Sequence, residues 1–156
     1  HNQFGGYTED STEYQLVLDR LLRKFETAKR LVPSAVLAGP GTREIGILSL
    51  GSSDAAIREA LDRLREAGVE ADYLRLRAFP FGPEVEQFLA THATVFVVEQ
   101  NRDAQLRSLL TLETAVDKAR LHSILHYSGL PMTAEFVTSA VLAALGSTAQ
   151  RRVAAG

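Results

Sequence analysis

The most constraining feature of this sequence is a short apolar run that ends abruptly in polar residues. Residues 95–98 read Val-Phe-Val-Val, and they are followed at once by Glu99, Gln100 and Asn101. An apolar run without alternation is typical of a strand that helices cover on both faces, as in a parallel sheet. We therefore predict a central parallel strand here. Its polar end would stand at the crest of the sheet, where open α/β folds meet ligands and partners.

Composition limits the classes of protein that this chain can form. Its 156 residues, with 46% hydrophobic and 23% charged, suit one globular domain. The absence of cysteine excludes disulfides, thiolate catalysis and cysteine-ligated metal centres, and it fits a cytoplasmic location. A net charge of -2 gives no drive toward nucleic acid, and no apolar run approaches the ~20 residues of a membrane span. The chain starts at His1 rather than Met, which raises the possibility of a longer polypeptide.

A long amphipathic helix is expected near the start, from Asp10 to about Val32. Asp10 and Glu13 have the spacing of a capping box. Apolar residues then recur at intervals of three and four: Tyr14, Val17, Leu18, Leu21, Leu22 and Phe25. The opposite face is charged, with Asp19, Arg20, Arg23, Lys24 and Lys29, and it is either solvated or a docking surface for another subunit.

The remaining pattern alternates between strands and helices. Strands are expected at 45–50 and 69–77, helices from Asp54, Pro83 and Ala104, an edge strand at 121–127 and a last helix from Thr133. This order favours right-handed βαβ units. We therefore expect a connecting segment, leading helix and linker over 1–43, an α/β domain over 44–146 and a frayed tail over 147–156.

The turn Gly51-Ser52-Ser53 is a candidate anion site, because it places backbone amides and two hydroxyls at a helix start. It lacks the lysine of a phosphate loop and the full dinucleotide fingerprint. A tight turn that merely caps the helix is the simpler interpretation of the same residues.

The four histidines and Glu99 are the candidates for direct chemistry. His122 and His126 would share a face, yet no acidic residue is placed to complete a metal site with them, so no metal is expected. His1 and His92 are likewise interpreted as surface or edge residues. Glu99 has the position of a general base at a strand end, but no nucleophile accompanies it. Turn and subunit-interface contacts through Glu99, Gln100 and Asn101 are the favoured interpretation.

The chain resembles the C-terminal portion of the α subunit of 2-oxoacid:ferredoxin oxidoreductases, the 2-oxoglutarate type in particular. The resemblance runs nearly end to end, through His1-Asn2-Gln3-Phe4-Gly5, Thr8-Glu9-Asp10, Arg20-Leu21-Leu22-Arg23-Lys24, Gly51-Ser52-Ser53, Val97-Val98-Glu99-Gln100-Asn101 with Gln105-Leu106, and His122 to Thr133. In the last stretch the family usually has lysine at His126, aspartate at Ser128 and arginine at Leu130.

This resemblance implies a transketolase C-terminal-like domain, with a mostly parallel open sheet, one antiparallel edge strand and helices on both faces. In the family, α and β subunits decarboxylate a 2-oxoacid with thiamine diphosphate and magnesium. They pass electrons through an iron–sulfur cluster to ferredoxin and form an acyl-coenzyme A. The family's catalytic and cofactor-binding residues have no counterparts in this sequence, so none is assigned. The expected role is subunit assembly with the β subunit and the rest of the α subunit.

Two other functions compete with that expectation. The chain could be a stand-alone α/β module that binds a small anion at residues 51–54. It could also be the equivalent domain of another transketolase-like dehydrogenase subunit.

Overall fold

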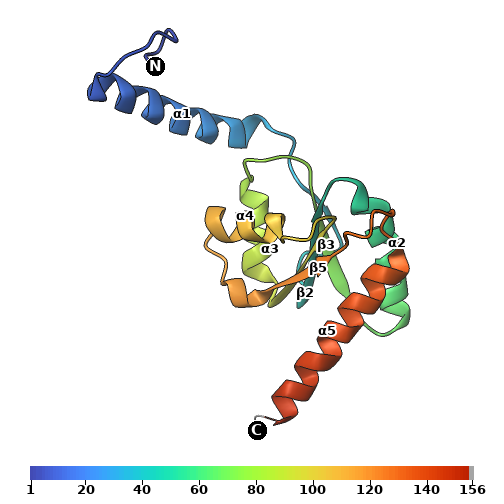
Figure 1. Cartoon of the computed structure of the whole chain (residues 1–156). Helices are drawn as coiled ribbons and strands as arrows, with labels where there is room; N and C mark the ends of the chain where they lie inside the picture. The colour runs from blue at the N-terminus through green and yellow to red at the C-terminus, as the bar shows by residue number, and fades with distance from the viewer. Residues whose placement is uncertain (155–156) are drawn as a thin grey trace.

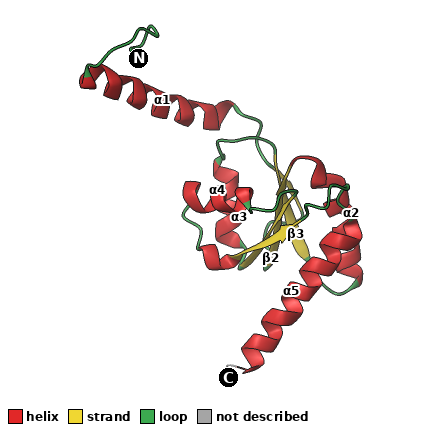
Figure 2. Ribbon diagram, viewed as in Figure 1, coloured by secondary structure: helices red, strands yellow, loops and turns green. Residues whose placement is uncertain are grey.

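A five-stranded sheet forms the centre of the molecule, as seen in a computed structural model that describes the backbone of residues 1–154 and the side chains of residues 1–146. Helices cover both of its faces (Figure 2). The strands are β1 (Val36–Ala38), β2 (Ile45–Leu50), β3 (Ala71–Leu76), β4 (Thr94–Glu99) and β5 (Leu121–Leu125). Their spatial order is β1-β3-β2-β4-β5.

The sheet is mostly parallel, which confirms the predicted fold class. β3, β2, β4 and β5 run parallel to their neighbours, and β1 alone pairs antiparallel, with Leu37 opposite Leu74. β4 is an interior strand as expected, although β2 holds the middle position. β1 lies inside the segment that we interpreted as a linker, and Val36 and Leu37 on it are partly exposed at the free edge of the sheet.

The helices begin where the sequence signals predict. They are α1 (Ser11–Leu31), α2 (Asp54–Glu66), α3 (Pro83–Thr91), α4 (Gln105–Glu113) and α5 (Ala134–Ala154), with short 3-10 turns η1 (Gly51–Ser53) and η2 (Lys118–Arg120). The Asp10 carboxylate accepts the Thr12 and Glu13 amides, and the Thr133 hydroxyl accepts the Phe136 amide. None of these helices is long and apolar enough to cross a membrane within the described residues.

The last helix is longer than expected. Its backbone continues through Gly146, where we predicted a frayed tail, and stays helical to Ala154. The final two residues of the predicted tail, 155–156, lie outside the described part of the chain.

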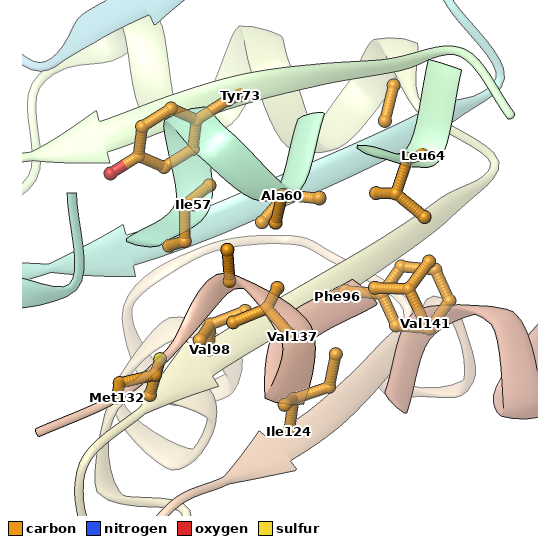
Figure 3. Close-up of a cluster of buried hydrophobic side chains, with 13 residues drawn as sticks. Ile57, Ala60, Leu64, Tyr73, Phe96, Val98, Ile124, Met132, Val137 and Val141 are labelled. Atoms are coloured by element: carbon orange, nitrogen blue, oxygen red, sulfur yellow. The ribbon is translucent and has the colours of Figure 1, made fainter. Parts of the chain in front are cut away.

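Burial on both faces explains the unbroken apolar run in β4. Val95 and Val97 point toward α3 and α4, whereas Phe96 and Val98 point toward α2 and α5. The second face carries a cluster in which Phe96 and Val98 meet side chains of both helices (Figure 3): Ile57, Ala60, Leu64, Val137 and Val141. Alternate residues of one strand therefore build two separate cores, and a polar residue at any of these four positions would break one of them.

The leading helix α1 stands apart from both cores. Figure 1 shows it projecting from the body, with its C-terminal end nearest the sheet. No residue of α1 is buried, although all of this helix belongs to the described part of the chain. The periodicity thus predicted the helix correctly, but most of its apolar side has no packing partner among the described residues, the contact of Phe25 with Phe79 excepted.

A buried polar network links Asp72, Arg43 and His92 at the amino ends of the parallel strands. Asp72 Oδ2 lies 2.9 Å from the Arg43 amide nitrogen and 3.1 Å from His92 Nε2. The His92 Nδ1 atom lies 2.7 Å from the Phe88 carbonyl oxygen at the end of α3. His92 is completely buried, so our interpretation of it as a surface or edge residue is wrong.

The charge of Asp72 is stabilised by these neighbours. Burial alone would raise the pKa of the Asp72 carboxyl. Hydrogen bonds from the Arg43 amide, from His92 and from the Gly41 amide, together with the Arg43 charge, nevertheless hold that pKa below its ordinary value. The network therefore favours the carboxylate in the folded state.

We predict that Asp72→Ala lowers the free energy of unfolding at pH 7 by about 3 kcal/mol, because it leaves His92 and Arg43 without their buried partner. The depressed folded-state pKa means that ionised Asp72 adds stability above its unfolded-state pKa of about 4, and that this contribution disappears as the pH falls through the folded-state value. Urea unfolding at neutral and acidic pH measures both effects. Asp62→Ala, at an exposed pair on α2, is the control and should change little.

Candidate functional site

The edge of the sheet at the carboxyl ends of the parallel strands, which we call the crest, has a topological switch point between β2 and β4. The chain passes from β2 to β3 on one side and then returns to place β4 on the other side of β2. Open α/β sheets form a crevice at such a point, beyond the carboxyl ends of the strands. Of the two candidate stretches, Gly51–Ser53 follows β2 directly, and Glu99–Asn101 begins with the last residue of β4. The fold therefore brings both candidate sites to one place.

The two stretches touch through a side-chain amide. Gln100 Nε2 donates to Ser52 Oγ at 3.1 Å and to Ser53 Oγ at 3.3 Å. Ser53 is buried, whereas Ser52 and Gln100 are exposed. Gln100 thus forms one polar group with two serines that lie 48 and 47 positions before it in the sequence. No local pattern could have predicted this contact.

Glu99 has a structural task. Its side chain is 4% exposed, and its two carboxylate oxygens accept the backbone amides of Leu106 at 2.7 Å and Arg107 at 3.0 Å. Asn101 Nδ2 adds a third hydrogen bond to Glu99 Oε2 at 2.8 Å. Leu106 and Arg107 belong to the first turn of α4, whose amides lack partners within the helix. Glu99 therefore caps α4 from the end of the neighbouring strand.

Asn101 completes this turn. Its Oδ1 atom accepts the Asp103 amide at 3.1 Å and the Gln105 amide at 3.3 Å. Ala104, at the cap position of α4, has a φ of 52°, a conformation that costs a non-glycine residue free energy. Alanine has no side-chain acceptor, so the caps come from Glu99 and Asn101. The turn hydrogen bonds that we expected of these residues are thus present, and of the polar trio Gln100 alone is exposed.

An open pocket of about 710 Å³ lies beside Gln100. The loop after β5 forms most of its wall, and its lining residues are Ser52, Gln100, His126, Tyr127, Gly129, Leu130, Pro131 and Met132. The backbone amide of His126 donates to the Glu99 carbonyl at 2.9 Å, which holds this loop against β4. Two of the three positions at which the sequence departs from the family pattern, His126 and Leu130, therefore line the hollow at the crest.

The proposed anion turn has its own neighbours. Gly51 has a φ of 87°, which explains the glycine, and Ser52 and Ser53 lead into α2. Asp54 stands in the first turn of α2, where its carboxylate pairs with Arg58 at 3.2 Å and Arg75 at 3.4 Å. A negative charge already complements the helix dipole at this end, which disfavours a second anion there.

The pocket does not match the needs of a metal-bound cofactor. Magnesium diphosphates are held by carboxylate and other oxygen ligands, whereas the residues lining this pocket include no carboxylate. No three histidine, aspartate or glutamate side chains gather as a metal site anywhere in the described residues. We therefore assign thiamine diphosphate and magnesium to none of the described residues.

We predict that Glu99→Ala lowers the free energy of unfolding by about 2 to 3 kcal/mol, because two amides of α4 lose their buried acceptor. Hydrogen exchange should also become faster at the first turn of α4. Glu113→Ala, at the exposed end of the same helix, is the matched control and should leave both measurements nearly unchanged. Equal stability of the two variants would contradict the capping role.

We further predict that Ala104→Gly raises the free energy of unfolding by about 0.5 to 1 kcal/mol, since glycine adopts a positive φ without steric cost. Thermal or urea unfolding measures the change. The same substitution at Ala90, in α3, should be destabilising, because there the backbone is helical.

Comparison with known proteins identifies relatives of this chain. No family model matches it. The α subunit of 2-oxoacid:ferredoxin oxidoreductase 2 from Aeropyrum pernix is 34% identical over 158 aligned positions, which cover 98% of this chain and 24% of the relative. The corresponding α subunit from Saccharolobus solfataricus is 25% identical over the same shares. The chain thus spans about a quarter of the length of the curated relatives that it matches.

Solved structures agree with the sequence relatives. A 2-oxoglutarate:ferredoxin oxidoreductase from Magnetococcus marinus superimposes with a TM-score of 0.77 at 24% identity, over 90% of this chain and 25% of that one, which confirms the transketolase C-terminal-like fold. The α chain of a probable 2-oxoacid ferredoxin oxidoreductase from Thermoplasma acidophilum is 31% identical, with a TM-score of 0.50, over 72% of this chain and 97% of that one. The chain therefore belongs to the α-subunit family of 2-oxoacid:ferredoxin oxidoreductases, to which it is homologous over nearly its whole length.

Proposed function

We propose that this chain is the C-terminal, transketolase C-terminal-like part of an α subunit, and that it serves structure and subunit assembly in a cytoplasmic enzyme. The complete enzyme would decarboxylate a 2-oxoacid on thiamine diphosphate and magnesium. It would use an iron–sulfur cluster, with ferredoxin as electron acceptor and coenzyme A as acyl acceptor. The observation that carries the proposal is 34% identity across 98% of the chain to an α subunit about four times as long.

The crest supports an assembly role better than a catalytic one. Glu99 is its buried acid, and the carboxylate oxygens are occupied by the amides of α4. The groups that face outward are mainly neutral amides, hydroxyls and apolar side chains, among them Gln100, Tyr127 and Leu130. His126 also lines the pocket, but it is partly buried and its Nε2 atom lies 3.2 Å from Ser128 Oγ. A largely neutral and partly apolar surface of this kind supports docking of another protein better than acid–base chemistry.

The 2-oxoglutarate type is the favoured class within the family. The structural relative from Magnetococcus marinus is a 2-oxoglutarate:ferredoxin oxidoreductase with 2-oxoglutarate, coenzyme A and succinyl-CoA bound. Turnover of 2-oxoglutarate, pyruvate and branched 2-oxoacids by the complete α–β complex tests this assignment. Preference for 2-oxoglutarate supports it, and preference for another acid would replace it.

The stand-alone anion module is disfavoured by Asp54, which already pairs with Arg75 at the start of α2. Calorimetry of the 156-residue chain with phosphate, coenzyme A and nucleotides separates the two functions. An assembly domain should release no binding heat with any of them, whereas saturable heat that is lost in a Ser52→Ala, Ser53→Ala variant would favour the anion module.

We predict that Leu130→Asp weakens assembly of the α subunit with the β subunit at least about tenfold, because it puts a charge into the apolar wall of the crest pocket. Leu130 is 70% exposed, so the stability of the chain itself should change little. Sedimentation titration measures the affinity. Leu112→Asp is the control, at a leucine that is 80% exposed on α4 and outside the pocket; equal affinities of both variants would refute the crest as the contact.

A further inference from the structure

An apolar stripe runs along α1 and, apart from the contact of its Phe25 ring with Phe79, is left uncovered by the described residues. We define the α1 stripe as Tyr14, Leu18, Leu21, Leu22 and Phe25. Each of these large side chains is more than two-fifths exposed. Single exposed leucines are ordinary on a protein surface, but five large apolar side chains in a row along one helix mark an interaction surface.

The spacing of the stripe fits a helical partner. Tyr14, Leu18, Leu21 and Phe25 follow each other at intervals of four, three and four, which is the seam of a helix packed against another helix. They extend over about 16 Å of the helix axis at 1.5 Å per residue. A helix of this kind obtains most of its stability from packing its apolar face, so α1 by itself lacks that contribution.

α1 is attached to the body only near its C-terminal end. The Phe25 ring meets the Phe79 ring edge to face, with centroids 6.3 Å apart, and Phe79 meets Phe81 in the same way at 5.2 Å. These rings hold the base of α1 against the loop that follows β3. The part of α1 before Phe25 projects away from the sheet (Figure 1), where another folded unit can reach it.

Charge indicates the kind of helix that fits. α1 carries five basic residues, Arg20, Arg23, Lys24, Lys29 and Arg30, and three acidic ones, Glu13, Asp19 and Glu26. Lys24 lies beside the stripe, whereas Lys29 lies one turn beyond Phe25, on the line of Leu22, and pairs with Glu26 at 2.9 Å. A partner with acidic residues beside its apolar face would complement Lys24 and the basic excess of α1. Two parallel copies of α1 would instead bring Lys24 of one chain toward Lys29 of the other, which disfavours a homodimer through the stripe.

We propose that the α1 stripe packs against an amphipathic helix with acidic flanks in the part of the α subunit that this chain does not cover. The inference rests on the proposed function, and the relatives supply the room for it, since three-quarters of their length lies outside the aligned region. A contact within one polypeptide also benefits from a high effective concentration.

Hydrogen exchange of the 156-residue chain and of the complete α subunit tests the proposal. The α1 amides should exchange at least about tenfold more slowly in the complete subunit, because docking must be undone before they open. Leu18→Ser with Leu21→Ser should remove that difference. Leu16→Ser is the matched control, because Leu16 is 60% exposed on the opposite side of the same helix and should keep the protection.

Three results would overturn the proposal. Equal exchange of α1 in the chain and in the complete subunit would show that the rest of the subunit does not cover the stripe. Protection that Leu16→Ser removes as well as Leu18→Ser with Leu21→Ser would place the contact elsewhere on α1. Sedimentation of the 156-residue chain as a dimer that the stripe variant alone dissociates would assign the stripe to a second copy. Turnover of a 2-oxoacid by the assembled complex reports on the proposed function separately, so an active complex with an unprotected α1 refutes this inference alone.

Discussion

The buried carboxylate of Asp72 is the interaction on which the arrangement of the sheet depends. It joins β3 to the segment entering β2 through Arg43 and to the end of α3 through His92. This junction tolerates no extra atoms, because a Cβ on Gly39 would collide with the carboxylate, and one on Gly46 would lie 2.8 Å from the Phe88 ring and 3.0 Å from the His92 ring. Three segments far apart in the sequence are therefore held at one end of the sheet by a single charge and the space that two glycines leave.

The opposite end of the sheet uses a second buried carboxylate in a similar way. Glu99 joins β4 to α4, as Asp72 joins β3 to its neighbours. The oxygens of both carboxylates already accept hydrogen bonds within the fold, so neither is free to contact a substrate. The outward groups at the crest are those of Gln100 and the loop after β5, which suits a domain that positions other domains. This division underlies the proposed assembly role.

Features that depend on residues close together in the sequence could be predicted, whereas features that depend on residues far apart in the sequence could not. The helix starts at Asp10, Pro83 and Thr133 could be predicted because caps and apolar periodicity are local signals. The apolar run before Glu99 likewise predicted a strand covered on both faces. The burial of His92 could not be predicted, since its partner Asp72 is 20 residues away and nothing near His92 in the sequence indicates it.

Two other features were hidden for different reasons. β1 is only three residues long and lies between prolines and glycines, so turn signals masked it. The capping role of Glu99 requires the last residue of a strand to meet Leu106, seven residues later in a helix, although the rapid change from apolar strand to helix start was a usable sign. The exposure of α1 shows a further limit, because periodicity reveals that a helix has an apolar side but not what covers it.

The shortness of β1 limits edge-to-edge association between copies of the protein. Free strand edges carry unpaired backbone groups that can recruit strands from other molecules and begin aggregation. Here Pro33 precedes the edge strand and Pro40 follows it, and a proline ring offers no amide hydrogen for pairing. On this side, the open sheet is thus protected against fibril-like growth by the same turn-rich segment that carries the chain from α1 into its core.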